Sequence, residues 1–331
     1  MSALIIKQGI LDTIQDNGRF GHQHNGINPG GTMDTIAASI ANILAGNKRD
    51  APIIELHFPA ATFQFTTACI IALSGGDFAA AINDECIPLN TAVLVAKDAV
   101  LKFSKPVNGA RCYIAVSGGW KAFNWLNSYS TNLKIGLGGY HGRALKKGDL
   151  PESILPGTIN ENILAGKSFF LLNEPIDVRS LYNLPGKIRC TLGAEFSWLS
   201  KQAKQELFEN EYTISTKSDR MGFQLEGSLL HTIKTESLRS SAVTKGTLQL
   251  LPSGKLIVLM ADHQTTGGYP KVAHVIGADI SGMAQKAINE KIEFSLVDLQ
   301  EAEDLFVAQQ HHLNNLENKL HQQKLKHPNI L

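Results

Sequence analysis

Short runs of strand-forming residues, separated by glycine, occupy most of this 331-residue chain. Two of these runs share a pattern, because residues 69–76 read CIIALSGG and residues 112–119 read CYIAVSGG. Each run has the length of a strand and ends at Gly-Gly, which supplies the positive φ angles that a tight turn needs. Similar runs lie at residues 91–95, 100–103, 168–172 and 187–192. The pattern predicts a mainly β protein, and the length fits two barrel-like domains of about 150 residues each.

Two segments carry a helical pattern. The first begins at Asp34 as N-cap, has apolar residues spaced along one face and ends at Gly46, where a C-cap glycine belongs. The second begins at Asp298, which with Glu301 forms a capping-box-like start, and must end before Pro328. Its apolar stripe packs on its own domain or on a partner chain; the stripe consists of Phe306, Leu313, Leu316 and Leu320.

A stretch rich in proline, glycine and asparagine at residues 146–166 suggests a linker. We therefore expect a β-rich domain over residues 1–165, a second β-barrel domain over residues 166–297, and a C-terminal amphipathic helix over residues 298–327.

The composition excludes several classes of function. A net charge of +1 gives no field that would attract nucleic acid, and no apolar stretch approaches the ~18 residues of a membrane span. The N-terminus has no signal-peptide pattern, so we expect a cytoplasmic protein. The four cysteines are widely spaced, which predicts free thiols rather than disulfides or a metal site; they are Cys69, Cys86, Cys112 and Cys190.

Several short patterns imitate catalytic motifs. Gly166-Lys167-Ser168 resembles the end of a phosphate-binding loop, but Glu161 stands where that loop requires a glycine. His22 and His24 have no third ligand at a recognisable spacing, so a surface turn is expected instead of a metal site. The Ser-Gly-Gly turns lack the glycine that precedes the serine in a nucleophile elbow.

The segment ADHQTTGGYP at residues 261–270 follows a largely apolar run and holds more polar groups than a turn needs. Gln264, Thr265 and Thr266 can each donate and accept hydrogen bonds, and Gly267-Gly268 lets backbone amides approach a ligand. The segment is therefore a candidate binding loop; the alternative is a wide loop whose hydroxyls cap its own backbone.

Two further clusters combine charged or polar residues with glycine in a way that suits a binding site. In the first, residues 15–19 read QDNGR and residues 29–34 read PGGTMD, where Gly-Gly opens a helix and would leave backbone amides free to hold an anion. The alternative to an anion site in this first cluster is a helix N-cap with a tight entry turn. The second cluster, residues 218–222, reads SDRMG, and its alternative is an exposed Asp-Arg pair.

These motifs together resemble the biotin-dependent carboxyltransferase family, also called urea amidolyase-related or allophanate hydrolase subunit 2. The resemblance rests on Ile-Gln-Asp-x-Gly-Arg, Pro-Gly-Gly-x-Met-Asp, Ser-Asp-Arg-Met-Gly-x-x-Leu-x-Gly and, above all, the motif at residues 252–270. It implies a pair of cyclophilin-like β-barrel domains that work with a homologous partner of the allophanate hydrolase subunit 1 type, the family's B subunit.

The resemblance also implies an activity. The commonest role of a stand-alone bacterial member is as the C subunit of an ATP-dependent 5-oxoprolinase, which converts 5-oxo-L-proline to L-glutamate together with the B subunit and a lactam-utilisation-type A subunit. ATP with Mg would then be a cofactor of the assembled complex. One alternative is the carboxyltransferase subunit of a biotin-dependent urea-type carboxylase, with biotin supplied in trans because the chain has no Met-Lys-Met attachment motif. The other is a non-catalytic regulator that binds the B subunit.

Position by position, the resemblance implies a binding site for a small amide substrate. The residues carried over to that site are Asp262, His263, Gln264, Thr265, Thr266, Gly267, Gly268, Tyr269 and Lys271, together with Arg220, Met221 and Gly222. A separate set of candidate residues comes from the QDNGR and PGGTMD segments, namely Arg19, Gly30, Gly31, Met33 and Asp34.

The spacing of these residues fixes no catalytic base. Lys271 or Arg220 could counter a carboxylate or phosphate, and Asp262 or His263 could exchange a proton, but no spacing in the sequence fixes these roles. The chain departs from the family pattern at Gln224, where an arginine is usual, and this change removes a charge-assisted contact.

Overall fold

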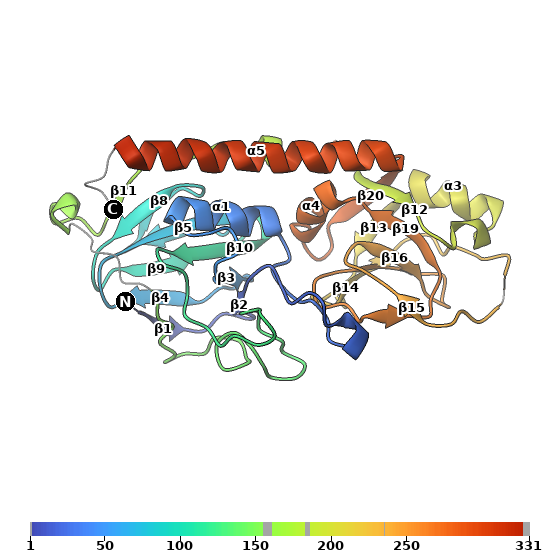
Figure 1. The fold of residues 1–331 in the computed structure, drawn as a ribbon, viewed down its shortest axis with the longest axis horizontal. Helices are drawn as coiled ribbons and strands as arrows, with labels where there is room; N and C mark the ends of the chain where they lie inside the picture. Colours follow the sequence, from blue (N-terminus) through green and yellow to red (C-terminus); the bar gives the residue numbers. More distant parts are fainter. Residues whose placement is uncertain (1, 155–160, 183–185, 235, 327–331) are drawn as a thin grey trace. The chain divides into compact units, whose positions relative to one another are not determined.

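The computed structural model describes residues 2–154, 161–182, 186–234 and 236–326. These residues form two compact units. The first unit draws on residues 1–18, 34–181 and 312–331, and the second on residues 19–33 and 182–311. Figure 1 shows a mainly β protein with few helices and a long C-terminal helix, α5, as the sequence predicts.

The first unit contains two sheets. The five-stranded sheet has the order β1-β4-β9-β6-β7 and the six-stranded sheet the order β11-β8-β5-β10-β3-β2. Their strands are β1 (Ala3–Lys7), β2 (Thr13–Gln15), β3 (Ile53–Leu56), β4 (Thr62–Phe65), β5 (Cys69–Asp77), β6 (Ala80–Ile82), β7 (Glu85–Cys86), β8 (Ala92–Val95), β9 (Val100–Phe103), β10 (Asn108–Val116) and β11 (Phe169–Leu171).

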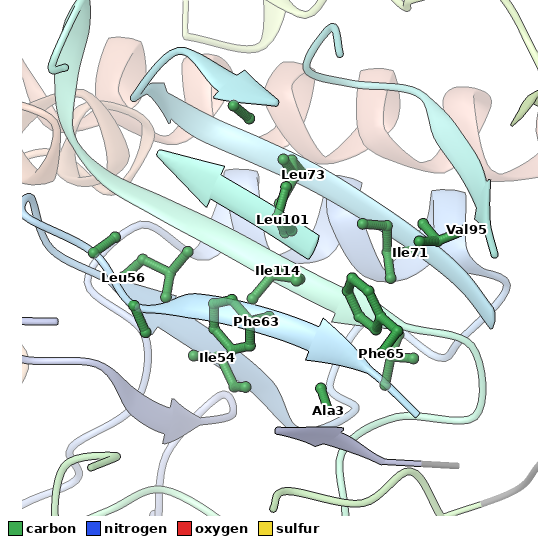
Figure 2. Close-up of a cluster of buried hydrophobic side chains, with 14 of the residues drawn as sticks. Ala3, Ile54, Leu56, Phe63, Phe65, Ile71, Leu73, Val95, Leu101 and Ile114 are labelled. Atoms are coloured by element: carbon green, nitrogen blue, oxygen red, sulfur yellow. The ribbon is translucent and has the colours of Figure 1, made fainter. Parts of the chain in front are cut away.

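The core of the first unit is built from both sheets. Phe63 and Leu101 from the five-stranded sheet share one buried cluster with Ile71 and Ile114 from the six-stranded sheet, as Figure 2 shows. The two similar runs of the sequence are β5 and β10, which pair antiparallel with Ile114 opposite Leu73. The sequence predicts a barrel here, and the strands pair as two sheets across this core.

The second unit is a closed barrel with the strand order β12-β19-β16-β17-β14-β13-β20. Its strands are β12 (Ile188–Leu192), β13 (Glu211–Ile214), β14 (Gly222–Glu226), β16 (Thr247–Leu250), β17 (Leu256–Leu259), β19 (Lys271–Val275) and β20 (Lys291–Leu296). A separate two-stranded sheet pairs β15 (Ser241–Ala242) with β18 (Thr266–Gly267). The described barrel confirms one of the two barrels that the sequence predicts.

The helices begin and end where their caps predict. The first, α1 (Thr35–Ala45), packs on β5 and β10; Asp34 accepts a bond from the Ala37 amide and Gly46 is left-handed with φ 85°. The Asp298 carboxylate accepts from the Glu301 amide at 2.8 Å at the start of α5 (Leu299–Lys326). The remaining helices are α2 (Arg179–Tyr182), α3 (Lys201–Glu209), α4 (Ile280–Ala284) and the 3-10 turns η1 (Gln23–Asn25), η2 (Glu161–Leu164), η3 (Phe196–Trp198) and η4 (Gly277–Asp279).

The stripe expected on α5 is only partly buried. Leu313 and Leu320 are buried, whereas 45% of Phe306 is exposed although its ring rests against Gly277. Within the described part of the chain, no helix has the length and apolar character that a membrane span requires.

The two units differ from the expected linear domains. Because β11 pairs with β8, the residues just after 166 belong to the first unit. Residues 19–33 belong to the second unit, where Met33 joins the barrel core. The expected linker at 146–166 and helix end at 327 lie partly outside the described residues.

Candidate functional site

Two of the predicted clusters lie side by side because they extend the same pair of strands. β14 pairs antiparallel with β17, with Gly222 opposite Leu259. Beyond this pair, the Met260 amide donates to the Met221 carbonyl at 3.0 Å and the Asp262 amide to the Arg220 carbonyl at 2.8 Å. The SDRMG segment and the start of the 261–270 loop therefore form one continuous ladder.

This close approach of the strands favours glycine at position 222. A Cβ atom there would lie 2.8 Å from Ile257 Cδ1 and 3.1 Å from the Val258 carbonyl oxygen. Such contacts are tighter than almost all real Cβ contacts, so a larger residue would displace the Ile257 side chain or shift the strand backbone.

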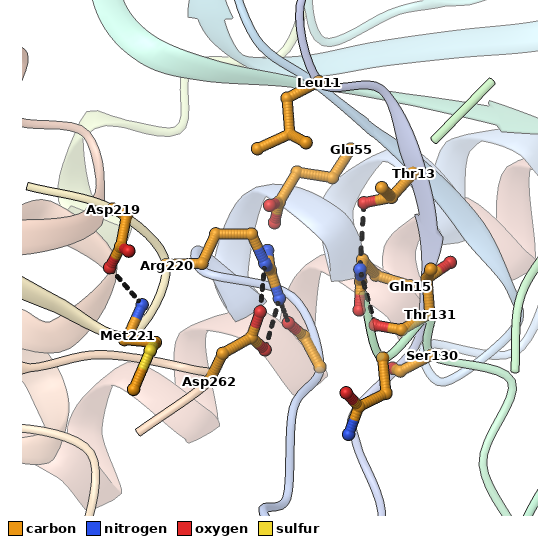
Figure 3. Close-up of polar contacts among 12 residues, drawn as sticks. Leu11, Thr13, Gln15, Glu55, Ser130, Thr131, Asp219, Arg220, Met221 and Asp262 are labelled. Atoms are coloured by element: carbon orange, nitrogen blue, oxygen red, sulfur yellow. Dashed lines mark hydrogen bonds and ion pairs between the residues drawn. The ribbon is translucent and has the colours of Figure 1, made fainter. Parts of the chain in front are cut away.

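Arg220 joins all three sequence clusters within the second unit. Its guanidinium donates from Nε to Asp262 Oδ2 at 2.9 Å and from Nη2 to Asp262 Oδ1 at 3.1 Å (Figure 3). Nη2 also donates to the Gly31 carbonyl at 2.6 Å. The residue is buried, with 4% exposed. This two-pronged pair holds the Pro-Gly-Gly segment, SDRMG and the candidate loop in one arrangement.

The Pro-Gly-Gly segment presents carbonyl oxygens to cations. Lys245 donates from Nζ to the Thr32 carbonyl at 3.1 Å and to the Met33 carbonyl at 2.8 Å. In the first unit, the Asp34 carboxylate caps α1 and the Asp34 amide donates to the Tyr113 hydroxyl at 2.8 Å. The start of α1 thus has the N-cap geometry that the sequence offers as the alternative to an anion site.

Arg19 belongs to the second unit and is buried, with 1% exposed. Its amide donates to the Pro29 carbonyl at 2.7 Å, which closes the segment between them. Asp16, from the same sequence motif, belongs to the first unit; its carboxylate accepts from the Ser128 hydroxyl at 2.7 Å and the Tyr129 amide at 2.6 Å. The QDNGR motif therefore divides between the units, and its aspartate ties the chain near residue 16 to residues 128–130.

His263 occupies the buried base of the loop, with 3% exposed. Its Nδ1 lies 2.5 Å from the Gln264 carbonyl. Burial lowers the pKa of His263, and the nearby Lys245 cation lowers it further, against the opposing effects of the Gln264 carbonyl and Asp262. The imidazole is therefore neutral at pH 7.

The second half of the loop is held by backbone hydrogen bonds to the residues that precede β16. Thr266 and Gly267 form β18, which pairs with β15, and the Val243 amide donates to the Thr265 carbonyl at 3.2 Å. We call residues 241–243 the strap. Lys271 also reaches the strap, because its Nζ donates to Ser241 Oγ at 2.6 Å. Gly268 lies beside Leu238 and Ser240, just before the strap, and Tyr269 is 44% exposed.

Lys271 is already engaged by a carboxylate. Its Nζ lies 3.3 Å from Glu195 Oε2, and its backbone amide donates to the same oxygen at 2.9 Å. Gln224, which stands in place of the family's arginine, lies on β14 between Phe223 and Leu225. Because these two neighbours point into the barrel core, Gln224 points outward.

Several residues of this site were not predicted from the sequence. Gln249 accepts a bond from Gln264 Nε2 at 3.2 Å, and Lys245, Glu195 and Ser241 bind other parts of the loop and its surroundings. The one available signal was a glutamine within the otherwise apolar strand Leu248-Gln249-Leu250. The other three lie in loops or a short strand, and long-range contacts of this kind leave no local pattern.

Comparison with known proteins identifies the family of this chain. The chain is 35% identical over 293 residues to the C subunit of 5-oxoprolinase from Haemophilus influenzae, an alignment that covers 88% of this chain and 90% of that protein. It is 33% identical over 317 residues to the C subunit of 5-oxoprolinase from Escherichia coli, with 96% of this chain and 98% of that protein covered.

A solved structure shows the same fold. The crystal structure of the Kluyveromyces lactis urea amidolyase matches 95% of this chain and 20% of its own chain, with a TM-score of 0.83 and 24% identity. The family model described as carboxyltransferase domain, subdomain A and B, matches residues 25–296, a range that includes both the Pro-Gly-Gly segment and the candidate loop. The chain therefore belongs to the carboxyltransferase domain family of subdomains A and B.

Proposed function

We propose that this chain is the C subunit of an ATP-dependent 5-oxoprolinase that converts 5-oxo-L-proline to L-glutamate with the A and B subunits. The observation that carries the proposal is its likeness to two proteins named as the C subunit of 5-oxoprolinase along nearly their whole length, 90% and 98%. The urea amidolyase, in contrast, is matched over only 20% of its chain. Relatives that match this chain along nearly their whole length are a better guide to its role than a much longer protein that contains a similar part.

The chemistry of the loop suits this substrate. 5-Oxoproline carries a lactam, which has one N–H donor and one carbonyl acceptor, and a carboxylate. Gln264, Thr265 and Thr266 provide neutral donors and acceptors beside the glycine amides at 267–268. The strap and the Arg220–Asp262 pair hold the backbone of this loop, so its polar groups keep their positions when a ligand binds.

Three cations of this region bind protein oxygens. Arg220 binds Asp262 and Gly31, Lys245 binds two carbonyls, and Lys271 binds Glu195 and Ser241. This arrangement does not fit a triphosphate, so we assign ATP and its Mg to the assembled cytoplasmic complex rather than to this loop. ATP would supply the free energy for opening the lactam, and this chain would bind and orient the lactam.

The test is the formation of glutamate from 5-oxoproline by the purified A and B subunits with ATP, with and without this chain. We expect glutamate only when all three proteins and ATP are present. A complex that assembles and forms no glutamate would show that the proposal is wrong.

One alternative keeps specific support, because the matched family is a carboxyltransferase family. In that role the chain would pass a carboxyl group from carboxybiotin, carried by another protein, to urea. The same purified complex should then consume urea in the presence of a biotin carboxylase, its biotinylated carrier, bicarbonate and ATP, which together form the carboxybiotin. A complex that does neither reaction, but in which this chain binds the B subunit, would act as a regulator.

A further inference from the structure

Gln249 is a buried polar residue on the outer face of the barrel. It lies in β16 between Leu248 and Leu250, both of which belong to the barrel core. Because side chains alternate along a strand, Gln249 points to the opposite side. It is nevertheless only 1% exposed, since the candidate loop covers it. A glutamine therefore lies between the barrel wall and the loop.

Its carboxamide oxygen fixes the orientation of a second glutamine. Gln264 Nε2 donates to Gln249 Oε1 at 3.2 Å. A carboxamide carries its nitrogen and oxygen on opposite branches, so a nitrogen held toward the barrel turns the oxygen of Gln264 the other way. Gln264 is half-buried, in contrast to Gln249.

The nitrogen of Gln249 packs under Gly267. Among the described residues, Gln249 Nε2 is buried and has no hydrogen-bond partner. A Cβ atom at position 267 would lie 2.4 Å from this nitrogen. A buried donor without a partner is destabilising, so the stability of the barrel does not explain a glutamine at this position.

The strap holds this arrangement in place. Ser241 pairs with Gly267 and Ala242 with Thr266, which keeps Gly267 above the Gln249 carboxamide. The Lys271–Ser241 bond attaches the strap to β19. The Gln249–Gln264 contact is thus enclosed by backbone on one side and by the barrel on the other.

We propose that Gln249 is a positioning residue, which holds Gln264 with its Oε1 directed at the N–H of a bound lactam. The inference rests on the proposed function, because that function supplies the lactam. In this arrangement Gln264 accepts the hydrogen bond that distinguishes a lactam from the corresponding lactone, in which an oxygen replaces the N–H. Gln249 does not touch the ligand and acts through Gln264.

The test compares two probes of the same shape, 2-pyrrolidone and γ-butyrolactone, by their dissociation constants for the assembled complex. We expect the natural chain to prefer the lactam. Gln249→Met removes the acceptor that holds Gln264 and should reduce this preference by up to about tenfold. Gln249→Glu retains an acceptor at the same place and should retain the preference.

Two further variants separate positioning from folding. Gly267→Ala leaves both glutamines intact but pushes the Gln249 carboxamide aside, so it should reduce the preference as Gln249→Met does. Gln309→Met removes another buried glutamine of the second unit, one that donates to the Ala278 carbonyl at 2.9 Å, and should leave the preference unchanged.

Equal weakening of both probes by Gln249→Met would show that Gln249 only supports the fold and would overturn the inference. A natural chain that binds neither probe, or binds both equally, would overturn it too. Failure of the proposed function gives a different result: the complex forms no glutamate from 5-oxoproline, while the Gln249-dependent preference for the lactam remains.

Discussion

Arg220 shows how one side chain organises this site. Its guanidinium binds Asp262, near the start of the polar loop, and the Gly31 carbonyl, while its own carbonyl accepts from the Asp262 amide. A buried arginine that makes this number of bonds to protein oxygens stabilises the folded site and does not balance the charge of a ligand. Of the roles that the sequence left open for Arg220 and Asp262, we therefore expect positioning of the loop.

Replacing Arg220 should destabilise the second unit. Arg220→Met leaves the Asp262 carboxylate without its partner and should lower the free energy of unfolding by about 3 kcal/mol. Arg220→Lys should recover little of this loss, because an ammonium group cannot make the two-pronged contact. Urea denaturation measures both. The double variant Arg220→Met with Asp262→Leu should lose less than the two single changes together, and strict additivity would contradict the pairing.

Thr266 allows a test of the loop that leaves its backbone unchanged. Thr266→Val keeps the shape of the side chain and the pairing of residue 266 with Ala242, but removes the hydroxyl. We expect kcat/KM for 5-oxoproline in the complex to fall by about tenfold or more, with binding to the B subunit unchanged. Thr191→Val, on β12 of the same unit, is the matched control. Loss of the B subunit together with activity would make the loop a contact surface.

Asp12, in the first unit, should make the stability of the protein depend on pH. Its carboxylate accepts from the Ala61 amide at 2.7 Å and the His57 amide at 3.2 Å. Burial nevertheless raises the pKa of Asp12 from 3.8 to about 7. The folded protein thus holds this proton to higher pH than the unfolded chain does, so protonation of Asp12 favours folding.

The contribution of Asp12 is complete below pH 3.8 and is lost as the pH rises to about 7. The loss of this contribution should lower the free energy of unfolding by about 4 kcal/mol across that pH range. Denaturation of the natural chain and of Asp12→Asn at several pH values measures the difference in slope, since the asparagine does not titrate. Parallel pH profiles would show that Asp12 has no such shift.

At the scale of elements, the features predicted from sequence are those with local signals. Asp34, Gly46 and Asp298 mark helix ends because a cap bonds to backbone only a few residues away. The strand at 256–259 is visible as an apolar run. The ladder that brings Arg220 beside Asp262 was not predictable in the same way, because its partners are 42 positions apart and nothing in either segment encodes the pairing.

That ladder can be tested at Gly222. Gly222→Ala places a methyl group against Ile257 and the Val258 carbonyl, and should destabilise the barrel by about 1–3 kcal/mol. It should also weaken substrate binding, since the shift is transmitted to the adjoining Arg220. Shortening the opposing side chain in Gly222→Ala with Ile257→Val should recover part of the stability in denaturation experiments. If the second change adds to the loss, steric contact is not the cause.

At the scale of the whole molecule, the order of residues in the chain does not follow the units. Residues 19–33 belong to the second unit although residues of the first unit flank them on both sides. The proline-rich stretch suggested a boundary near 166, but pairing of β11 with β8 keeps the chain in the first unit beyond it. Composition marks where a chain is irregular, and only the contacts show which core each segment joins.

The division predicts the behaviour of fragments. Residues 182–311 alone lack Met33 from the barrel core and the Gly31 carbonyl that binds Arg220, so this fragment should not fold cooperatively. Fusing residues 19–33 to it through a flexible linker should restore a cooperative thermal transition. Equal transitions for the two fragments would show that the 19–33 segment adds nothing to the stability of the barrel.

The same connectivity limits how a gene for this protein can be rearranged. The chain passes from one unit to the other at residues 18–19, 33–34, 181–182 and 311–312, the last of these within α5. Any single break between residues 34 and 311 leaves each piece with parts of both units and neither unit whole. A single crossover between residues 34 and 311 therefore cannot exchange one unit and keep the other whole, so we expect the two units to be inherited, duplicated and fused to other domains as a pair.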